Sequence, residues 1–177
     1  NEGVHGDETF MKLAQDPLIV DCVEALIGPD IILWGCQLFC KPPTDEMEVP
    51  MHQDGAYWPI RPLATCTAWV ALDASTVENG CMRVVPGTQR YPSLKHQKDS
   101  REGLVLNQKV IDDRVDTNNP IDLSLPEGGF SLHDVHLVHG SNPNLSGNRR
   151  AGLAIRYMPA TSIFNRDLIE TGSGAGY

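Results

Sequence analysis

Three side chains that bind metal ions and one arginine form the most distinctive chemical pattern in this sequence of 177 residues. His52 and Asp54 are separated by one residue, and His139 follows far downstream, shortly before Arg150. Two imidazoles and one carboxylate are the set that binds iron(II) on one face and leaves its other positions open. A guanidinium can hold a carboxylate through two parallel hydrogen bonds. The pattern therefore predicts an iron(II) oxygenase that uses 2-oxoglutarate and O2.

The His52-Gln53-Asp54 motif is predicted to lie on an extended strand. Residues two apart on a strand point to the same side, so both side chains can reach one ion. Gly55 would let the chain turn away directly afterwards. So short a motif also occurs as a solvated histidine and aspartate, and the second half of the pattern is needed to support a metal site.

Three histidines compete for the third ligand position. His139 stands directly before Gly140-Ser141, where a strand would end at a cavity mouth. His133 shares its strand parity but would lie roughly 20 Å away along one continuous strand, and His136 would point to the opposite face. We expect His139 to be the ligand. The roles of His133 and His136 stay open between ordinary packing and, for His136, a hydrogen bond to a ligand.

The arginines after His139 support the same assignment. Arg149 and Arg150 are adjacent, so only one of them can point into the interior from a strand. Arg156 has the parity of Arg150 and is expected to line the same cavity, although a surface position is also open for it. A buried arginine needs an anionic partner, and a dicarboxylate cosubstrate would supply one.

Composition narrows the class of protein. Hydrophobic residues make up 41% and charged residues 21%, which is typical of a globular domain. The net charge of -9 argues against nucleic acid or an anionic membrane as a partner and leaves a small-molecule substrate. No apolar run has the length of a membrane span and no signal peptide is visible. Five cysteines without a paired spacing favour reduced thiols and a cytoplasmic protein.

The expected elements are two helices near the start and short strands after them. Asp7 or Thr9 could cap a first helix, and Asp16-Pro17 is typical of an N-cap followed by proline at the first helical position. Gly28-Pro29 ends the second helix. The segments predicted as strands are 31–40, 65–72, 82–85, 130–139 and 151–158, and residues 91–119 are predicted as a variable insert or lid.

This order favours a mainly β fold, a double-stranded β-helix (jelly roll, cupin-like) with flanking N-terminal helices. We expect one catalytic domain over residues 1–177, with a helical flank at about 7–28 and a β core at about 31–159. The oligomeric state is left open.

Several separated blocks, in the right order, resemble the phytanoyl-CoA dioxygenase (PhyH-like) family of iron(II)- and 2-oxoglutarate-dependent oxygenases. The resemblance runs from about residue 33 to residue 159. The matching blocks are Lys41-Pro42-Pro43, His52-Gln53-Asp54, Thr67 to Leu72, Glu78 to Met82, Pro86-Gly87-Thr88, and His139 to Arg150.

The resemblance implies roles for individual residues. It implies His52, Asp54 and His139 as iron ligands, and Arg150 with Ser141 as partners of the distal carboxylate of 2-oxoglutarate. Lys41 would bind the cosubstrate, and Gln37 would contact the cosubstrate or the substrate. Tyr57 and Trp69 would line the substrate pocket, with core packing equally open for Trp69.

Departures from the family pattern carry their own expectations. Related halogenases replace the carboxylate ligand, so the presence of Asp54 favours hydroxylation or another oxidation. Gln89 stands where many relatives have histidine, which would alter the pocket rim. The N-terminal region is short and the chain stops soon after the last motif, so we expect family elements to be missing at both ends.

Two other functions stay open. A cupin-like hydrolase or isomerase could use the same ligands for zinc or manganese, but it would not explain why Arg150 and Lys41 converge near the metal. The other is a non-catalytic jelly-roll binding protein. The acidic chain favours a small polar metabolite as the substrate, and Tyr57 and Trp58 would also suit a cationic amine.

Overall fold

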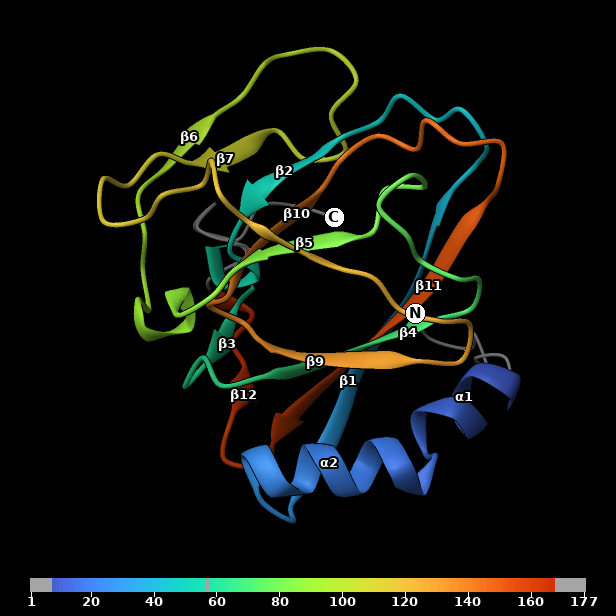
Figure 1. The fold of residues 1–177 in the computed structure, drawn as a ribbon. Helices are drawn as coiled ribbons and strands as arrows, with labels where there is room; N and C mark the ends of the chain where they lie inside the picture. The colour runs from blue at the N-terminus through green and yellow to red at the C-terminus, as the bar shows by residue number, and fades with distance from the viewer. Residues whose placement is uncertain (1–7, 57, 168–177) are drawn as a thin grey trace.

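The computed structural model describes residues 8–56 and 58–167, which form two helices and a sandwich of two four-stranded antiparallel sheets (Figure 1). The larger core sheet has the order β1-β11-β4-β9, with bounds Ile31–Lys41, Arg150–Pro159, Cys66–Ala71 and Phe130–Asp134. The facing sheet has the order β2-β10-β5-β8, with bounds Val49–His52, Val138–Ser141, Met82–Val85 and Ile121–Leu123. The predicted jelly roll is confirmed.

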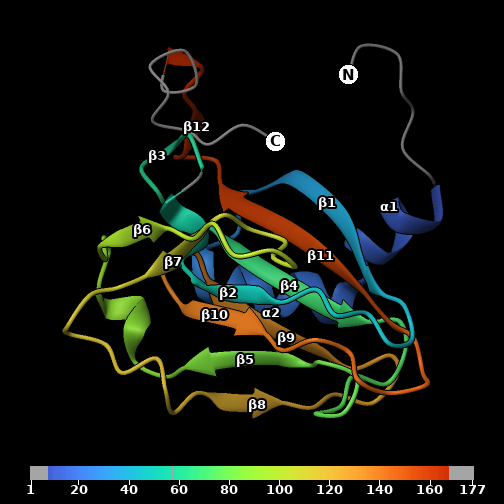
Figure 2. The same cartoon turned by 90° about the horizontal axis from the view of Figure 1, so that it is seen from above.

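Two small strand pairs lie beside this sandwich (Figure 2). One joins β3 (Ile60–Arg61) to β12 (Ile163–Phe164), and the other joins β6 (His96–Lys98) to β7 (Gln108–Val110). Short 3-10 turns, η1 (Asp54–Ala56) and η2 (Thr88–Arg90), follow β2 and β5. The β6-β7 pair lies within the predicted insert, and the role of this insert as a lid stays a prediction.

The helices α1 (Glu8–Ala14) and α2 (Pro17–Ile27) cover the outer face of the core sheet (Figure 1). As predicted, Asp16 caps α2 by accepting the Leu18 N–H at 2.9 Å. The helix ends before Gly28, whose φ of 89° favours glycine. Thr9 lies within α1 and so does not cap it, and Asp7 lies outside the described residues.

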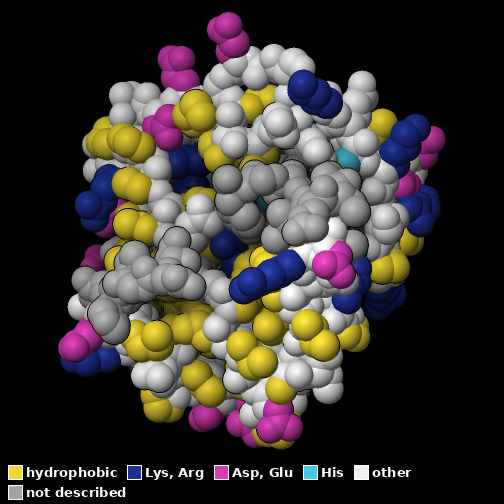
Figure 3. All heavy atoms as spheres, turned by 180° about the vertical axis from the view of Figure 1, so that it is seen from behind, with side chains coloured by type: hydrophobic (Ala, Val, Ile, Leu, Met, Phe, Trp, Pro, Cys, Tyr) yellow, Lys and Arg dark blue, Asp and Glu magenta, His cyan; other side chains and the backbone are white. Residues whose placement is uncertain are grey.

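Hydrophobic side chains fill both faces of the core sheet but also reach the surface. Ile19 and Val23 of α2 are buried in a cluster with outward side chains of β4 and β11. Leu18 and Leu26 on the same helix stay exposed. The face seen from behind gathers hydrophobic atoms on its lower half (Figure 3). No helix among the described residues is both long enough and apolar enough to cross a membrane.

The predicted strand 130–139 is wrong as a single element, because the chain turns between β9 and β10. Asp134 makes this turn: its carboxylate accepts the His136 N–H at 2.7 Å and its carbonyl accepts the Leu137 N–H at 3.0 Å. The two halves therefore belong to opposite sheets. The other four predicted strands are confirmed with small shifts at their ends.

Candidate metal centre

Neighbouring strands of the facing sheet bring two histidines side by side. His52 ends β2 and lies directly opposite His139 of β10, with ring centroids 4.3 Å apart. Asp54 follows in η1, and its Oδ1 lies 3.3 Å from His52 Nε2 and 3.9 Å from His139 Nε2. The prediction that Asp54 lies on the same strand as His52 is wrong, because β2 ends before Asp54. The 3-10 turn nevertheless brings one ligand atom of each residue to within 4.8 Å of the others.

Backbone carbonyls orient both imidazoles toward this point. His52 Nδ1 lies 2.8 Å from the Pro50 carbonyl, and His139 Nδ1 lies 2.9 Å from the Leu137 carbonyl. A carbonyl can only accept, so Nδ1 carries the proton and Nε2 keeps its lone pair for a metal. The sequence left open a hydrogen bond between His136 and a metal ligand. For His139, the Leu137 carbonyl makes that hydrogen bond instead.

The electrostatics of the group suit a metal ion. Burial alone raises the pKa of Asp54, but its contact with His52 and the nearby imidazoles of His139 and His133 outweigh this and hold the pKa well below its ordinary value. Burial lowers the pKa of His139 to about 3. At neutral pH the site thus has an ionised carboxylate beside a neutral imidazole, the forms that coordinate metals.

His133 is much closer to this group than the sequence predicted. Its ring centroid lies 4.8 Å from that of His139, because the turn after β9 folds the two strands onto opposite sheets. The side chain is buried, and neither ring nitrogen has a hydrogen-bond partner among the described residues. Burial lowers its pKa.

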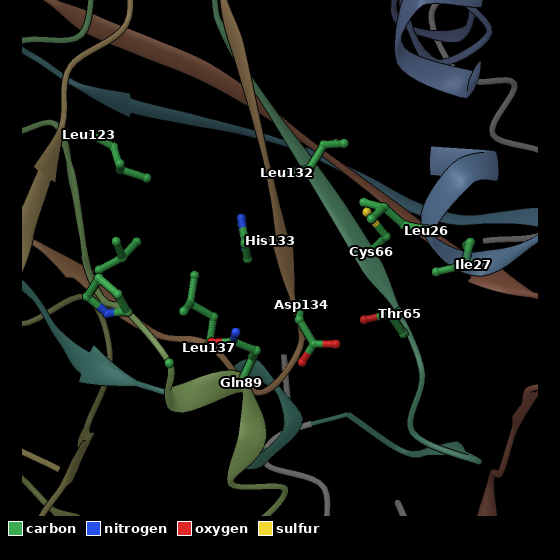
Figure 4. Close-up of a pocket in the computed structure, with 13 residues that line it drawn as sticks. Leu26, Ile27, Thr65, Cys66, Gln89, Leu123, Leu132, His133, Asp134 and Leu137 are labelled. Atoms are coloured by element: carbon green, nitrogen blue, oxygen red, sulfur yellow. The ribbon is translucent and has the colours of Figure 1, made fainter. Parts of the chain in front are cut away.

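A cavity of about 510 Å³ lies on one side of His133, between the sheet edges (Figure 4). Its lining is mostly apolar and includes Leu132, Leu137 and Leu123. Gln89 lines this cavity, and its effect on the rim of the substrate pocket stays a prediction.

Two buried cations lie at the other end of the core sheet. Lys41 of β1 is directly opposite Arg150 of β11, and their exposed fractions are 4% and 5%. Lys41 Nζ donates to the carbonyls of Met47 at 2.7 Å and Asn142 at 2.5 Å. The Arg150 guanidinium lies 5.3 Å from the centre of the Trp69 ring. Within the described residues, neither cation forms an ion pair.

Such a pair of like charges is unfavourable without an anion. Burial, followed by the charge of Arg150, lowers the pKa of Lys41 to about 8, and burial also lowers the pKa of Arg150. Ser141 belongs to the same end of the sandwich, because it directly precedes Asn142, which binds Lys41. Ser141 Oγ and Arg150 Nε are shielded from solvent and have no hydrogen-bond partner in the part of the chain described. These residues fit a carboxylate-bearing cosubstrate.

The adjacent arginines face opposite sides, as predicted. Arg149 is exposed and pairs with Asp73 at 2.8 Å, whereas Arg150 is buried. Trp69 is buried between the sheets, and a Cβ on Gly152 would lie 2.0 Å from its ring. Only glycine therefore leaves room for Trp69 beneath Arg150.

The remaining predicted site residues, Gln37, Arg156 and Tyr57, have different outcomes. Gln37 is exposed and accepts a hydrogen bond from Arg156 Nη1 at 3.0 Å. Arg156 itself is buried on the face that Arg150 shares, so the surface position that was open for it is wrong. Tyr57 lies outside the described residues.

Two polar residues that support the site were missed. The Gln53 side chain is buried and binds the carbonyls of Tyr91 and His136, each at 2.7 Å, and the Leu94 N–H at 3.0 Å. It thus ties the insert and the β9-β10 turn to the metal motif. Its position between the predicted metal ligands His52 and Asp54 could have identified it from the sequence.

Asn144 is the second. It is fully buried and donates to the carbonyls of Lys41, Pro42 and Asn148. It thereby anchors the strand end that carries Lys41. Asn144-Leu145-Ser146 also matches a glycosylation acceptor, a match that we attribute to chance because this asparagine is enclosed.

Comparison with known proteins agrees with this geometry. A family model described as "Phytanoyl-CoA dioxygenase (PhyH)" matches residues 1–152. The chain belongs to the phytanoyl-CoA dioxygenase family. A "Probable phytanoyl-CoA dioxygenase" of Caenorhabditis elegans is 32% identical over 85% of this chain and 51% of the relative. "Phytanoyl-CoA dioxygenase, peroxisomal" of Bos taurus is 31% identical over 87% of this chain and 47% of the relative.

A solved structure is also similar. It is described as the epimerase SnoN in complex with Fe3+, alpha ketoglutarate and nogalamycin RO. The TM-score is 0.77 at 25% identity, over 97% of this chain and 68% of that one. This PhyH-family chain spans about half the length of the two curated relatives.

Proposed function

We propose that this chain is a non-haem iron(II)- and 2-oxoglutarate-dependent dioxygenase that hydroxylates a small polar metabolite and releases succinate and carbon dioxide. One observation carries the proposal. A largely enclosed two-histidine, one-aspartate group shares the interior of one sandwich with two buried cations that have no acidic partner among the described residues. A hydrolase would use the first feature but not the second.

His52, Asp54 and His139 would hold the metal through Nε2, a carboxylate oxygen and Nε2. Iron bound there would supply the redox chemistry that oxidises 2-oxoglutarate and the substrate together. Arg150 would hold the distal carboxylate of 2-oxoglutarate, and Ser141 would donate its hydroxyl hydrogen to it. Lys41 would add a second positive charge.

The walls of the site keep the reacting groups in place and limit water. Trp69 packs against the Arg150 guanidinium and restricts its rotation. Gln53 closes one side by binding three backbone groups of neighbouring segments. The substrate identity and a cytoplasmic location stay predictions.

Calorimetric titration of 2-oxoglutarate into the iron(II)-loaded protein under argon tests the proposal. In Arg150→Gln the dissociation constant should rise about 10- to 100-fold, because a charge-assisted pair in a buried site is lost. Arg149→Gln is the matched control: its arginine is adjacent in sequence but exposed and paired with Asp73. Its affinity should stay within about twofold of wild type.

Equal losses in the two variants would remove the basis for a buried cosubstrate site. Tight binding of zinc without any binding of 2-oxoglutarate would instead favour the metal-dependent hydrolase.

A further inference from the structure

A row of polar side chains crosses the inner face of the core sheet. The strand register places Gly35, Arg156, Thr67 and His133 directly beside one another on β1, β11, β4 and β9. Arg156 shares the parity of Ala154, which packs between the sheets, so this row faces the sandwich interior. At its His133 end the row meets the metal group, since His133 lies against His139.

The three side chains of this row are buried but incompletely bonded. Arg156 Nε, Thr67 Oγ1 and both ring nitrogens of His133 are shielded from solvent without a hydrogen-bond partner in the described part of the chain. Buried polar groups in folded proteins are almost always satisfied, by protein, water or ligand. A row of such groups beside a metal centre indicates that a ligand completes them.

Arg156 determines the charge of that ligand. Its guanidinium lies 5.1 Å from the Trp58 ring centre, 5.7 Å from Trp34 and 5.9 Å from Phe39. These rings pack around the cation but cannot neutralise it, and no carboxylate among the described residues pairs with it. The donors along the guanidinium edge are the groups that grip an oxyanion. Gln37, which is exposed, binds this edge and marks the side that solvent reaches.

We propose that Arg156, with Thr67 and His133, binds an oxyanion of the substrate, either a carboxylate or a phosphorus oxyanion. This inference rests on the proposed function and names the substrate class. Neighbouring strands are about 4.8 Å apart, so the backbones of Arg156 and His133 are separated by about 10 Å. An anion held along this row would therefore lie beside the metal group, since His133 packs against His139. A cationic amine is disfavoured, because Arg156 already lies against Trp58.

The test uses protein loaded with iron(II) and 2-oxoglutarate under argon, so that the cosubstrate site is filled and no turnover occurs. Three probes of one size are titrated calorimetrically: benzoate, phenylphosphonate and benzylamine. At least one anion should bind, and benzylamine should not. The better anion distinguishes a carboxylate substrate from a phosphorus oxyanion.

Two variants locate the binding. Arg156→Gln should weaken the anion about tenfold or more, and Thr67→Val, which keeps the side-chain shape, should weaken it several-fold. Arg114→Gln is the control, because this arginine is exposed and pairs with Asp112. In Arg156→Gln the affinity for 2-oxoglutarate should stay within about twofold of wild type, since Arg150 holds that ligand.

Three results would overturn the inference: no saturable binding of either anion, equal anion affinity in Arg156→Gln, or loss of 2-oxoglutarate in that variant. Failure of the proposed function is separate. It would show as absent 2-oxoglutarate binding in the wild type, where the anion probes can still be titrated into the metal-free protein.

Discussion

The two faces of the core sheet are built from the same strands but differ in chemistry. On β11, Leu153, Ile155 and Tyr157 face outward and pack with the helices, whereas Arg150 and Arg156 face inward. The outward side chains are apolar or form hydrogen bonds, as the Tyr157 hydroxyl does by donating to the Ala14 carbonyl at 2.8 Å. Inward groups include several buried donors with no partner in the described residues.

This difference separates stability from function within one strand. Burial of apolar area stabilises a fold in proportion to that area, which the outer face supplies. Unpaired buried polar groups oppose folding and are retained where ligands use them. Substitutions on the outer face should therefore reduce stability, and those on the inner face should reduce ligand binding.

The largest stability effect should come from Ile155→Ala. The side chain is fully buried in the outer cluster, so its truncation leaves a cavity and should cost about 2–5 kcal/mol. Urea unfolding followed by circular dichroism measures this. Under native conditions the variant should still bind 2-oxoglutarate with wild-type affinity. A loss of affinity greater than the unfolded fraction accounts for would show that the outer face also contributes to ligand binding.

A smaller effect should appear in the pH dependence of 2-oxoglutarate binding. The pKa of Lys41 is lowered to about 8 in the free protein, and a bound anion raises it. Binding therefore takes up a proton above pH 8, and the dissociation constant should increase about tenfold from pH 7 to pH 9. Calorimetry across this range measures it. Lys41→Arg keeps its charge and should give a flat profile, and a flat wild-type profile would exclude Lys41 from the site.

The smallest effect is expected from Thr67→Val on stability. The threonine hydroxyl is buried without a partner in the described residues, so its replacement by a methyl group should change the free energy of unfolding by less than about 0.5 kcal/mol or increase it. Urea unfolding of the ligand-free protein checks this. A cost comparable to that of Ile155→Ala would mean that the inner face is built for stability as well.

Local signals predicted most of the fold. Asp16-Pro17 and Gly28 set the bounds of α2 through capping and backbone preference, and apolar, β-rich runs bounded by turn residues predicted four strands of the sandwich. The β9-β10 turn was missed, because Asp134 makes it without a glycine or proline. Because this turn was missed, His133 was predicted at a distant position along one strand, whereas it lies against His139 of the metal group.

The sequence predicted those site residues that a short motif or the alternation of side chains along a strand identifies. His52, Asp54 and His139 converge, and the inward position of Arg150 follows from strand alternation. The unpaired state of Lys41 and Arg156 depends on contacts between strands that are distant in sequence, which no local pattern encodes. Gln53 was overlooked although it stands between two predicted ligands, because its role depends on three partners from two later segments.

The most direct test of the account is an anaerobic titration of metal-free protein with iron(II) and then 2-oxoglutarate, followed by visible absorption. We expect a charge-transfer band that requires both additions, is lost in Asp54→Ala and weakens in Arg150→Gln. A folded protein that binds iron(II) but gives no band with 2-oxoglutarate would contradict the claim that the inner face holds both at one centre.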